Sequence, residues 1–577
     1  MFTKYLAQLV RIVFAVAVSC AFCVAQPAWV QQRKRGEAGS DFLFGLGYMT
    51  ENLAAPFAEI GASQAKLNYG MSHWEEIEPD PPVDGNHTYH WSNLDSMIAE
   101  YQAHGFSETH ITLKAKSAWG TQGCTTTSCV PYLPRPEHWQ DYEAYVRAVV
   151  ERYDNDGIDD MPGLLYPVRQ YEIETEADAL WPNRCMEDPD DPDRASTYLQ
   201  VLASAQQVAR EAYPDVQILP AAMLFYGLFS GEPDAAAILE RRSRDTVESR
   251  AVNCVAAFNE EILRHPEYFD AVEFHYLGDD YREIATTIHW LYEQMERNNY
   301  RKPIYPTDLP TGPALVPTSF YKEEFHLYPQ DVAKDYLDII RENIASDPPS
   351  QEYLDIRTWY AGEQAAFTVK LLLATMEEGG AGVQLASMTD FNSLLCYTPS
   401  FYVYAYEVLS WAIHGMADMG WTSCLPACLF FGNCEVQQPR PVFYTLRWFV
   451  ANLGDFDTVE RLDMVPDAPG AADVYAYQVQ AGDRVITVFW AEDGIGQVMD
   501  EPKSTVTLTL PASAPVITVT HTITQVGQTE PTLEFIAATE QVTLTVGESP
   551  VFVEGLQPQQ PTPQYTVYLP VVLKGGE

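Results

Sequence analysis

The 577-residue sequence is poor in basic residues: 35 lysines and arginines stand against 80 aspartates and glutamates, a formal net charge of −45. Such an excess of acid repels polyphosphate, so nucleic acid is not expected as a partner. Apolar runs of membrane-spanning length are also lacking. A hydrophobic content of 46% with 12% aromatic residues is typical of a globular protein and excludes collagen, coiled coil and disordered chains.

The first 25 residues have the layout of a secretory signal. Lys4 and Arg11 precede an apolar stretch, Ile12 to Ala25, that ends in small residues. This stretch is shorter than the roughly 20 residues of a membrane-spanning helix, so a retained anchor is the lesser alternative. Lipidation at Cys20 is a second one. We therefore expect an extracytoplasmic protein, secreted or at the cell surface, with no transmembrane span after signal cleavage.

Export bears on the cysteines. Removal of the signal takes two of the ten and leaves an even eight in an oxidising compartment, where disulfides are the default. Cys124 and Cys129 would close a short loop, and the cluster of Cys424, Cys428 and Cys434 is expected to supply at least one more bridge. Because this cluster lacks zinc-finger spacing, we predict no metal site, and nothing in the sequence calls for a cofactor.

Between residues 42 and 455, short apolar strands alternate with amphipathic helical stretches, as in parallel strands joined by right-handed helical crossovers. Eight such units predict an α/β fold, a (β/α)₈ TIM barrel with insertions. The predicted strands are Phe44 to Met49, Ala65 to Tyr69, Thr109 to Lys116, Arg169 to Glu176, Val216 to Ala221, Ala271 to Tyr276, Pro303 to Asp308 and Val383 to Asp390.

After residue 455 the pattern changes to alternating strands with turn residues between them, which predicts an antiparallel all-β sandwich over 456–556. Residues 26–41 are interpreted as a linker, and 557–577 as a Pro/Gln-rich linker with a carboxyl-terminal tail. The predicted sandwich strands include Val474 to Val479, Val485 to Trp490, Ser504 to Leu510, Val516 to Thr524 and Val542 to Val546.

Alternation within the strands places charged side chains inside the predicted barrel. Glu172, Glu174 and Glu176 share one strand face, and the opposite, apolar face must meet the helices. Unpaired ions in a lumen cost several kcal/mol each, so lysines and glutamates must largely neutralise one another there. We favour this structural role for Glu172 and Glu273. The same parity turns inward Lys66, Asn68, His110, Thr112, Lys114, Lys116, Glu273 and His275.

Reactive groups in such barrels lie at the carboxyl ends of strands, where Glu176 ends the fourth and Asp308 the seventh. Paired carboxylates suit acetal hydrolysis: one protonates the leaving oxygen and the other captures the oxocarbenium-like carbon. As general acid, Glu176 must be protonated near neutral pH, and we expect Glu174 to raise its pKa by like-charge repulsion. Asp390 is either a substrate contact or the cap of a loop. The predicted substrate contacts are Thr175, Trp119, Trp181, His275, Tyr276 and Asp390.

The two segments that carry these carboxylates, Tyr171–Glu176 and Lys302–Asp308, resemble the strand-four and strand-seven motifs of the clan A glycoside hydrolases. The resemblance spans about residues 42–556. It implies hydrolysis of O-glycosidic bonds with retention, Glu176 as acid/base and Asp308 as nucleophile, on a carbohydrate substrate and without a cofactor. Other similar segments are Trp74–Pro79, Tyr89–Asp95, His275–Tyr276, Glu363–Ala365, Pro441–Leu446 and Pro550–Val553.

Two positions depart from the family pattern. Thr175 replaces the Asn that hydrogen-bonds the sugar 2-hydroxyl, and Asp308 replaces a Glu. The shorter side chain widens a pair that the family holds about 5–5.5 Å apart, unless the backbone moves in. A wider inverting site and a non-catalytic carbohydrate-binding or cell-surface protein on a disabled hydrolase barrel therefore stay open. Another alternative is a barrel enzyme of different chemistry that uses the Lys66, Lys114 and Lys116 cluster. A nucleophilic lysine there needs a depressed pKa, which nearby carboxylates oppose.

Overall fold

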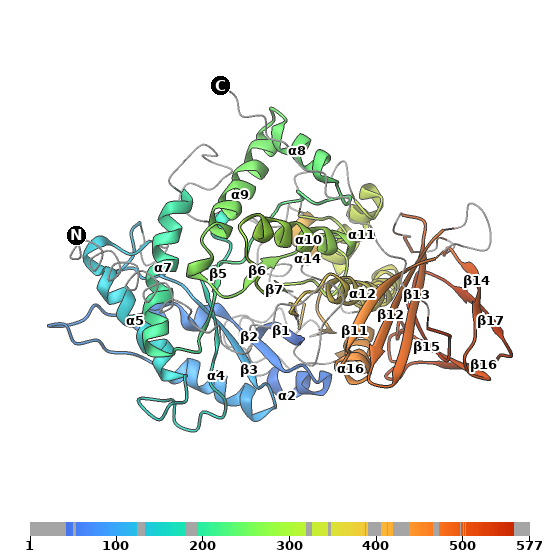
Figure 1. Ribbon diagram of the computed structural model, residues 1–577, viewed down its shortest axis with the longest axis horizontal. Coiled ribbons are helices and arrows are strands. Elements are labelled where there is room, and N and C mark those ends of the chain that lie inside the picture. Colours follow the sequence, from blue (N-terminus) through green and yellow to red (C-terminus); the bar gives the residue numbers. More distant parts are fainter. Residues whose placement is uncertain are drawn as a thin grey trace, which may run out of the picture.

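The computed structural model describes residues 42–49, 53–123, 133–180, 194–318, 326–343, 348–386, 388–390, 406–411, 413–418, 438–464, 472–494, 496, 498–499, 501 and 503–558 (Figure 1). No helix in these ranges is long and apolar enough to cross a bilayer. Several predictions fall outside the described residues and stay predictions: the signal, the carboxyl-terminal tail, Trp181, and Cys124, Cys129, Cys185, Cys396, Cys424, Cys428 and Cys434.

All eight predicted strands of the α/β region are present. Most end earlier than predicted. At β4 and β7 the reason is that Glu174 and Asp308 adopt the left-handed backbone region, with φ of 63° and 52°, which interrupts regular strand pairing. The strands are β1 (Leu43–Met49), β2 (Gln64–Leu67), β3 (Glu108–Leu113), β4 (Gln170–Ile173), β5 (Gln217–Pro220), β6 (Val272–His275), β7 (Ile304–Thr307) and β8 (Gly382–Leu385).

These strands form a curled parallel sheet of six, in the order β5-β4-β3-β2-β1-β8, and a separate parallel pair, β6-β7. The predicted closed eight-stranded ladder is therefore corrected. A proline lies at each of the two gaps, Pro220 between β5 and β6 and Pro306 between β7 and β8. Two residues before each proline, the carbonyls of Ile218 and Ile304 still accept hydrogen bonds from the N–H groups of Asp270 and Ala381, which precede β6 and β8. Because alternate residues of a strand face the same neighbour, each proline lacks the N–H that the next rung needs.

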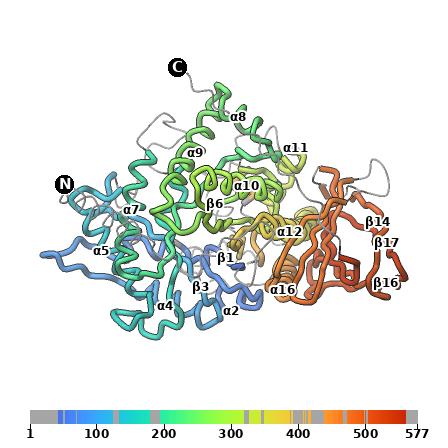
Figure 2. The backbone as a smooth tube through the Cα atoms, viewed as in Figure 1, coloured from blue at the N-terminus to red at the C-terminus, as the bar shows by residue number. Residues whose placement is uncertain are grey.

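Helices pack around the curled sheet, and the green and blue helices surround it in Figures 1 and 2. The predicted apolar faces are buried, as in the helix that contains Leu94, Ile98 and Tyr101. The longer helices are α4 (Ser92–Ala103), α5 (Trp139–Arg152), α7 (Arg194–Ala212), α8 (Ala235–Ser243), α9 (Val247–Leu263), α10 (Arg282–Arg297), α11 (Gln330–Asn343), α12 (Gln351–Glu377) and α16 (Pro441–Leu453); the shorter ones are α2 (Ala54–Phe57), α3 (Trp74–Ile77), α6 (Ala177–Leu180) and α14 (Tyr406–Trp411).

After α16 the architecture changes to two antiparallel sheets around a common core, which appear in orange and red at one end of the molecule (Figure 2). Buried and exposed residues alternate along β14 and β17, as the sequence predicts. The larger sheet is β11 (Thr458–Asp463), β12 (Asp473–Ala481), β13 (Arg484–Glu492), β18 (Val551–Glu554), β15 (Val516–His521) and β16 (Leu533–Ala537); β14 (Val506–Pro511) pairs with β17 (Gln541–Val546), and β9 (Ala417–Asp418) with β10 (Gln438–Pro439).

An aromatic cluster joins the two regions. The Trp490 ring of β13 stacks on Tyr475 at 5.4 Å, and its Nε1 donates to the Tyr281 hydroxyl at 3.0 Å. That hydroxyl donates in turn to Glu492, which also binds Lys370 of α12. The α/β region and the sandwich therefore share one hydrophobic core.

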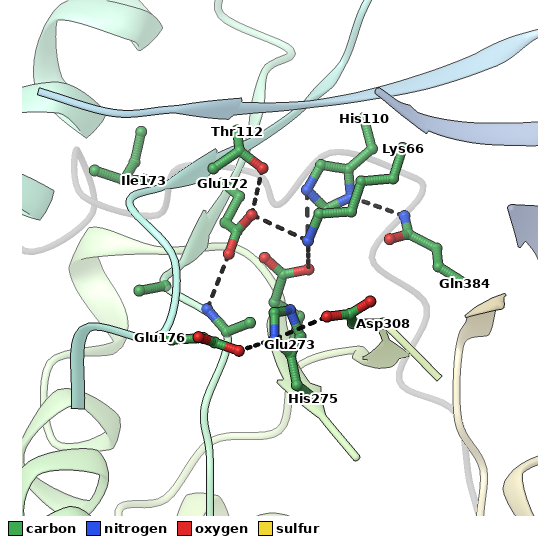
Figure 3. A network of polar contacts seen from close by, with 12 residues as sticks. Lys66, His110, Thr112, Glu172, Ile173, Glu176, Glu273, His275, Asp308 and Gln384 are labelled. Carbon is green, nitrogen blue, oxygen red and sulfur yellow. Dashed lines mark hydrogen bonds and ion pairs between the residues drawn. The ribbon is translucent and has the colours of Figure 1, made fainter. Parts of the chain in front are cut away.

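Charged side chains occupy the interior of the curled sheet, as predicted (Figure 3). Lys66 Nζ lies 3.0 Å from Glu172 Oε2 and 3.3 Å from Glu273 Oε2, and all three side chains are at most 6% exposed. Lys116 is an exception. Because β3 ends at Leu113, this lysine lies beyond the strand, where it pairs with Glu75 and is 33% exposed.

Replacement of Lys66 by Met tests this network. It would leave buried glutamates without their cation, so we expect the free energy of unfolding to fall by about 3–5 kcal/mol. The matched variant Lys116→Met breaks a half-exposed pair and should change that free energy by no more than about 1 kcal/mol. Urea denaturation of both variants checks the difference, and equal effects would contradict a structural role for the buried pair.

Candidate active site

Glu176 and Asp308 converge at the carboxyl ends of β4 and β7, with His275 of β6 between them (Figure 3). His275 Nδ1 lies 2.8 Å from Glu176 Oε1 and 3.6 Å from Asp308 Oδ2. One ligand atom from each of the three residues can be chosen so that all lie within 4.8 Å of one another. Glu176 is the more open carboxylate, with 22% of its side chain exposed against 6% for Asp308. Glu176 is therefore partly open to solvent, whereas Asp308 is buried beside it.

The backbone is strained where it presents these groups. Tyr48, Glu174, Glu176 and Asp308 have φ of 54°, 63°, 48° and 52°, values that cost non-glycine residues about 1–3 kcal/mol each. All four lie at the carboxyl ends of β1, β4 and β7. Strain of this kind clusters at active sites and ligand clamps, where the surrounding fold holds it in place.

Tyr48 belongs to the site although sequence reasoning missed it. Its hydroxyl donates to Asp308 Oδ2 at 2.7 Å, so it fixes one oxygen of this carboxylate. The other oxygen, Oδ1, is buried and has no hydrogen-bond partner among the described atoms. Tyr48 lies next to the end of the first predicted strand, so inspection of every strand end for polar side chains would have found it.

The three groups have displaced pKa values. Burial raises the pKa of Glu176, but the hydrogen bond and charge of His275 outweigh it and hold this pKa below the usual range. Burial raises the pKa of Asp308, opposed by His275 and Tyr48. For His275, burial is outweighed by Asp308 and Glu176, which raise its pKa. The expected increase in the pKa of Glu176 is therefore wrong, because the neighbouring imidazole dominates.

The interior lysines below this site have pKa values shifted in opposite directions. The charges of Glu172 and Glu273 raise the pKa of Lys66 against the effect of burial. Burial lowers the pKa of Lys114 even though carboxylates surround it. As expected, carboxylates oppose the effect of burial at both lysines. They outweigh it at Lys66 but not at Lys114, which is only 3% exposed.

Glu174 lies deeper than Glu176 and has a different environment. Its Oε1 accepts the backbone N–H of Ala115 at 2.6 Å, whereas Oε2 is buried without a hydrogen-bond partner in the described part of the chain. Burial raises the pKa of Glu174 to about 8. This carboxyl is therefore largely protonated at neutral pH.

The predicted substrate contacts lie in different surroundings. Thr175 is buried between the two strained glutamates. Tyr276 donates to the carbonyl of Asp280 at 2.6 Å and lines a cavity between the loops after β5 and β6. Trp119 donates to the carbonyl of Glu78 and packs against Trp74 at 4.7 Å, as a local anchor does.

Asp390 is neutralised by protein groups. Its carboxylate binds Arg357 at 2.6 Å and Arg440 at 2.5 Å, and it accepts the Gly415 N–H at 2.9 Å. These contacts favour a structural role, the loop-capping alternative, over direct contact with substrate.

No protein-family model and no curated protein matches the sequence. Solved structures are similar over most of the chain. An exported protein from Bacteroides fragilis has a TM-score of 0.50 at 10% identity and covers 91% of this chain and 99% of its own. A glucosidase from Croceicoccus marinus has 0.49 at 11% identity, with coverage of 91% and 98%. An alpha-L-arabinofuranosidase from Thermotoga maritima has 0.48 at 10%, with coverage of 92% and 99%. The Bacteroides likeness shows a shared fold.

Replacement of Glu174 by Gln tests its protonation. A carboxyl whose folded pKa is raised adds stability that is full below its unfolded pKa, near 4.5, and is lost as pH rises through the folded value. Relative to Glu174→Gln, the wild type should therefore lose up to about 1.4 kcal/mol of unfolding free energy per pH unit across this window. Denaturation of both proteins between pH 5 and about pH 8 measures this difference; parallel curves would show that Glu174 is ionised.

Proposed function

We propose that the chain is an exported glycoside hydrolase that cleaves O-glycosidic bonds of an oligo- or polysaccharide with retention, on a barrel of the clan A type. The observation that carries the proposal is the approach of Glu176 and Asp308 to within 4.8 Å. Single parallel bridges, Met223 to Phe274 and Leu309 to Leu385, join the two parallel sheets and support the barrel interpretation. Export rests on the predicted signal.

The spacing supports retention over inversion. Retaining enzymes hold their carboxyl groups about 5–5.5 Å apart, whereas inverting enzymes leave about 6.5–9.5 Å for a water. Asp308 reaches this spacing although its side chain is one methylene shorter than that of Glu. A protein that only binds sugar does not need two carboxylates at this spacing. The close pair therefore supports an enzyme over the carbohydrate-binding alternative.

In this mechanism Glu176 protonates the departing oxygen while Asp308 Oδ1, the oxygen without a partner, attacks the anomeric carbon. The glycosyl–Asp308 ester is then hydrolysed by a water that Glu176 deprotonates, so the proton returns to this residue. Tyr48 holds the nucleophile in place through Oδ2. We keep Thr175 as the contact to the sugar 2-hydroxyl, and His275 and Tyr276 as further substrate contacts.

The pKa directions favour a second assignment with the roles exchanged. Glu176 is the more acidic carboxyl and Asp308 the less acidic one, and a general acid needs the raised pKa. Exchange would make Asp308 the acid and Glu176 the nucleophile, whereas strand position and exposure favour the assignment above. Both assignments use the same two residues in exchanged roles, and a single experiment can distinguish them.

Chemical rescue by azide separates the two assignments. On a panel of 4-nitrophenyl glycosides, Glu176→Ala and Asp308→Ala should each lose about 10²-fold or more in kcat/KM. Added azide should give a glycosyl azide of retained configuration from Glu176→Ala and of inverted configuration from Asp308→Ala. The opposite configurations would exchange the roles.

The exposed variant Glu211→Gln, far along α7, is the matched control and should keep wild-type activity. An inert wild type on every glycoside and polysaccharide, with sugar binding by calorimetry, would replace the hydrolase by the carbohydrate-binding alternative.

Replacement of Tyr48 by Phe tests the support of Asp308. Loss of one hydrogen bond to a charged group is worth about 1.5–3 kcal/mol, so kcat/KM should fall by roughly one to two orders of magnitude. Because the hydroxyl lowers the pKa of Asp308, the limb of the pH profile that belongs to Asp308 should move to higher pH. A loss of activity with an unmoved pH profile would reduce Tyr48 to a packing role.

A further inference from the structure

Both carboxylates of the site approach the same nitrogen. Glu176 Oε1 and Asp308 Oδ2 lie 2.8 Å and 3.6 Å from Nδ1 of His275. An ion that takes the place of the proton on this nitrogen therefore meets two carboxylate oxygens at once. Figure 3 shows the three side chains converging from different strands.

The separations suit a small divalent cation. Bonds of about 2.0–2.2 Å to nitrogen and oxygen place neighbouring ligands of a tetrahedral ion roughly 3.4 Å apart. The two measured contacts bracket this value, and the three ligand atoms lie within 4.8 Å of one another. Changes of about 0.6 Å and 0.2 Å in the two measured separations, and of at most about 1.4 Å in the third, close the set around one ion.

Two further observations point to a ligand. Asp308 is 5% exposed, and its Oδ1 has no hydrogen-bond partner in the described chain. Its Oδ2 is held by Tyr48 at 2.7 Å, the kind of outer hydrogen bond that orients a ligating carboxylate. Glu176 is 22% exposed, which leaves an entry path and a fourth position for water.

We propose that Glu176, His275 and Asp308 bind one divalent transition-metal ion of the Zn²⁺ class, and that the bound ion inhibits by occupying the carboxylate pair. A mixed nitrogen and oxygen set favours such ions over Mg²⁺ or Ca²⁺, which prefer oxygen alone. The binding part is independent of the enzymatic proposal, whereas the inhibition part rests on it.

Binding is measured by calorimetry with ZnCl₂ on the full chain, in excess Mg²⁺ to occupy acidic surface groups. The wild type should bind one equivalent. His275→Gln and Asp308→Asn should abolish that event, and Tyr48→Phe, which leaves all ligands present, should weaken it about tenfold. Circular dichroism confirms that each variant is folded.

His265 supplies a matched control, a histidine that also contacts two carboxylates. Its two nitrogens contact Glu261 at 3.3 Å and Glu267 at 3.2 Å, so the carboxylates lie on opposite sides of the ring and cannot share one ion. His265→Gln should leave Zn²⁺ binding unchanged. Absence of saturable binding, or an equal loss in His265→Gln and His275→Gln, would overturn the proposal.

The inhibition part uses glycoside hydrolysis. Zn²⁺ should lower the rate competitively with substrate, and EDTA should restore it. Loss of activity in EDTA alone would overturn the inhibition, because the ion would then be a requirement. Binding in a chain that cleaves no glycoside would sink the hydrolase proposal and keep the metal site, whereas activity without binding would do the reverse.

Discussion

The pairing of Lys66 with Glu172 and Glu273 is the constraint on which the architecture depends. Three ionisable groups lie inside a parallel sheet, each at most 6% exposed, and no single one of them is tolerable there alone. The three groups together carry no net charge near neutral pH. Lys66 lowers the pKa of Glu172, which stays ionised, whereas burial and Glu172 raise the pKa of Glu273 to about 8, which keeps it protonated. These ion pairs link β2, β4 and β6, which are not neighbours in the sheets, through their side chains.

The candidate site is arranged around the imidazole ring of His275, which contacts both of its carboxylates. His275 stands between Glu176 and Asp308, lowers the pKa of the first and opposes the increase in the pKa of the second. Their acidities therefore depend on one ring, and a substrate that displaced the ring would change both at once. The strained backbone at the ends of β1, β4 and β7 keeps these groups close enough for this dependence to operate.

Strand positions and the inward set were largely predictable, since both follow from alternation along each strand, and Glu176, Asp308 and His275 were found by inspection of strand ends. The strand lengths were not, because the left-handed conformations of Glu174 and Asp308 carry no signature in their residue types. Pro220 and Pro306 can be read from the sequence. Which neighbouring strand each proline faces depends on the alternation of backbone direction along the strand, which the sequence does not give. The pKa of Glu176 depended on the rotamer of a ring contributed by another strand.

The stack of Trp490 on Tyr475, anchored to Tyr281 and Lys370, has a consequence for evolution and engineering. Trp490 and Tyr475 belong to the sandwich, whereas Tyr281 and Phe367 belong to the α/β region that carries Glu176. Either half produced alone would therefore expose aromatic rings that contact the other half. The sandwich therefore covers an apolar surface of the α/β region. Recombination that exchanges α/β regions between proteins of this architecture would have to move the sandwich with them.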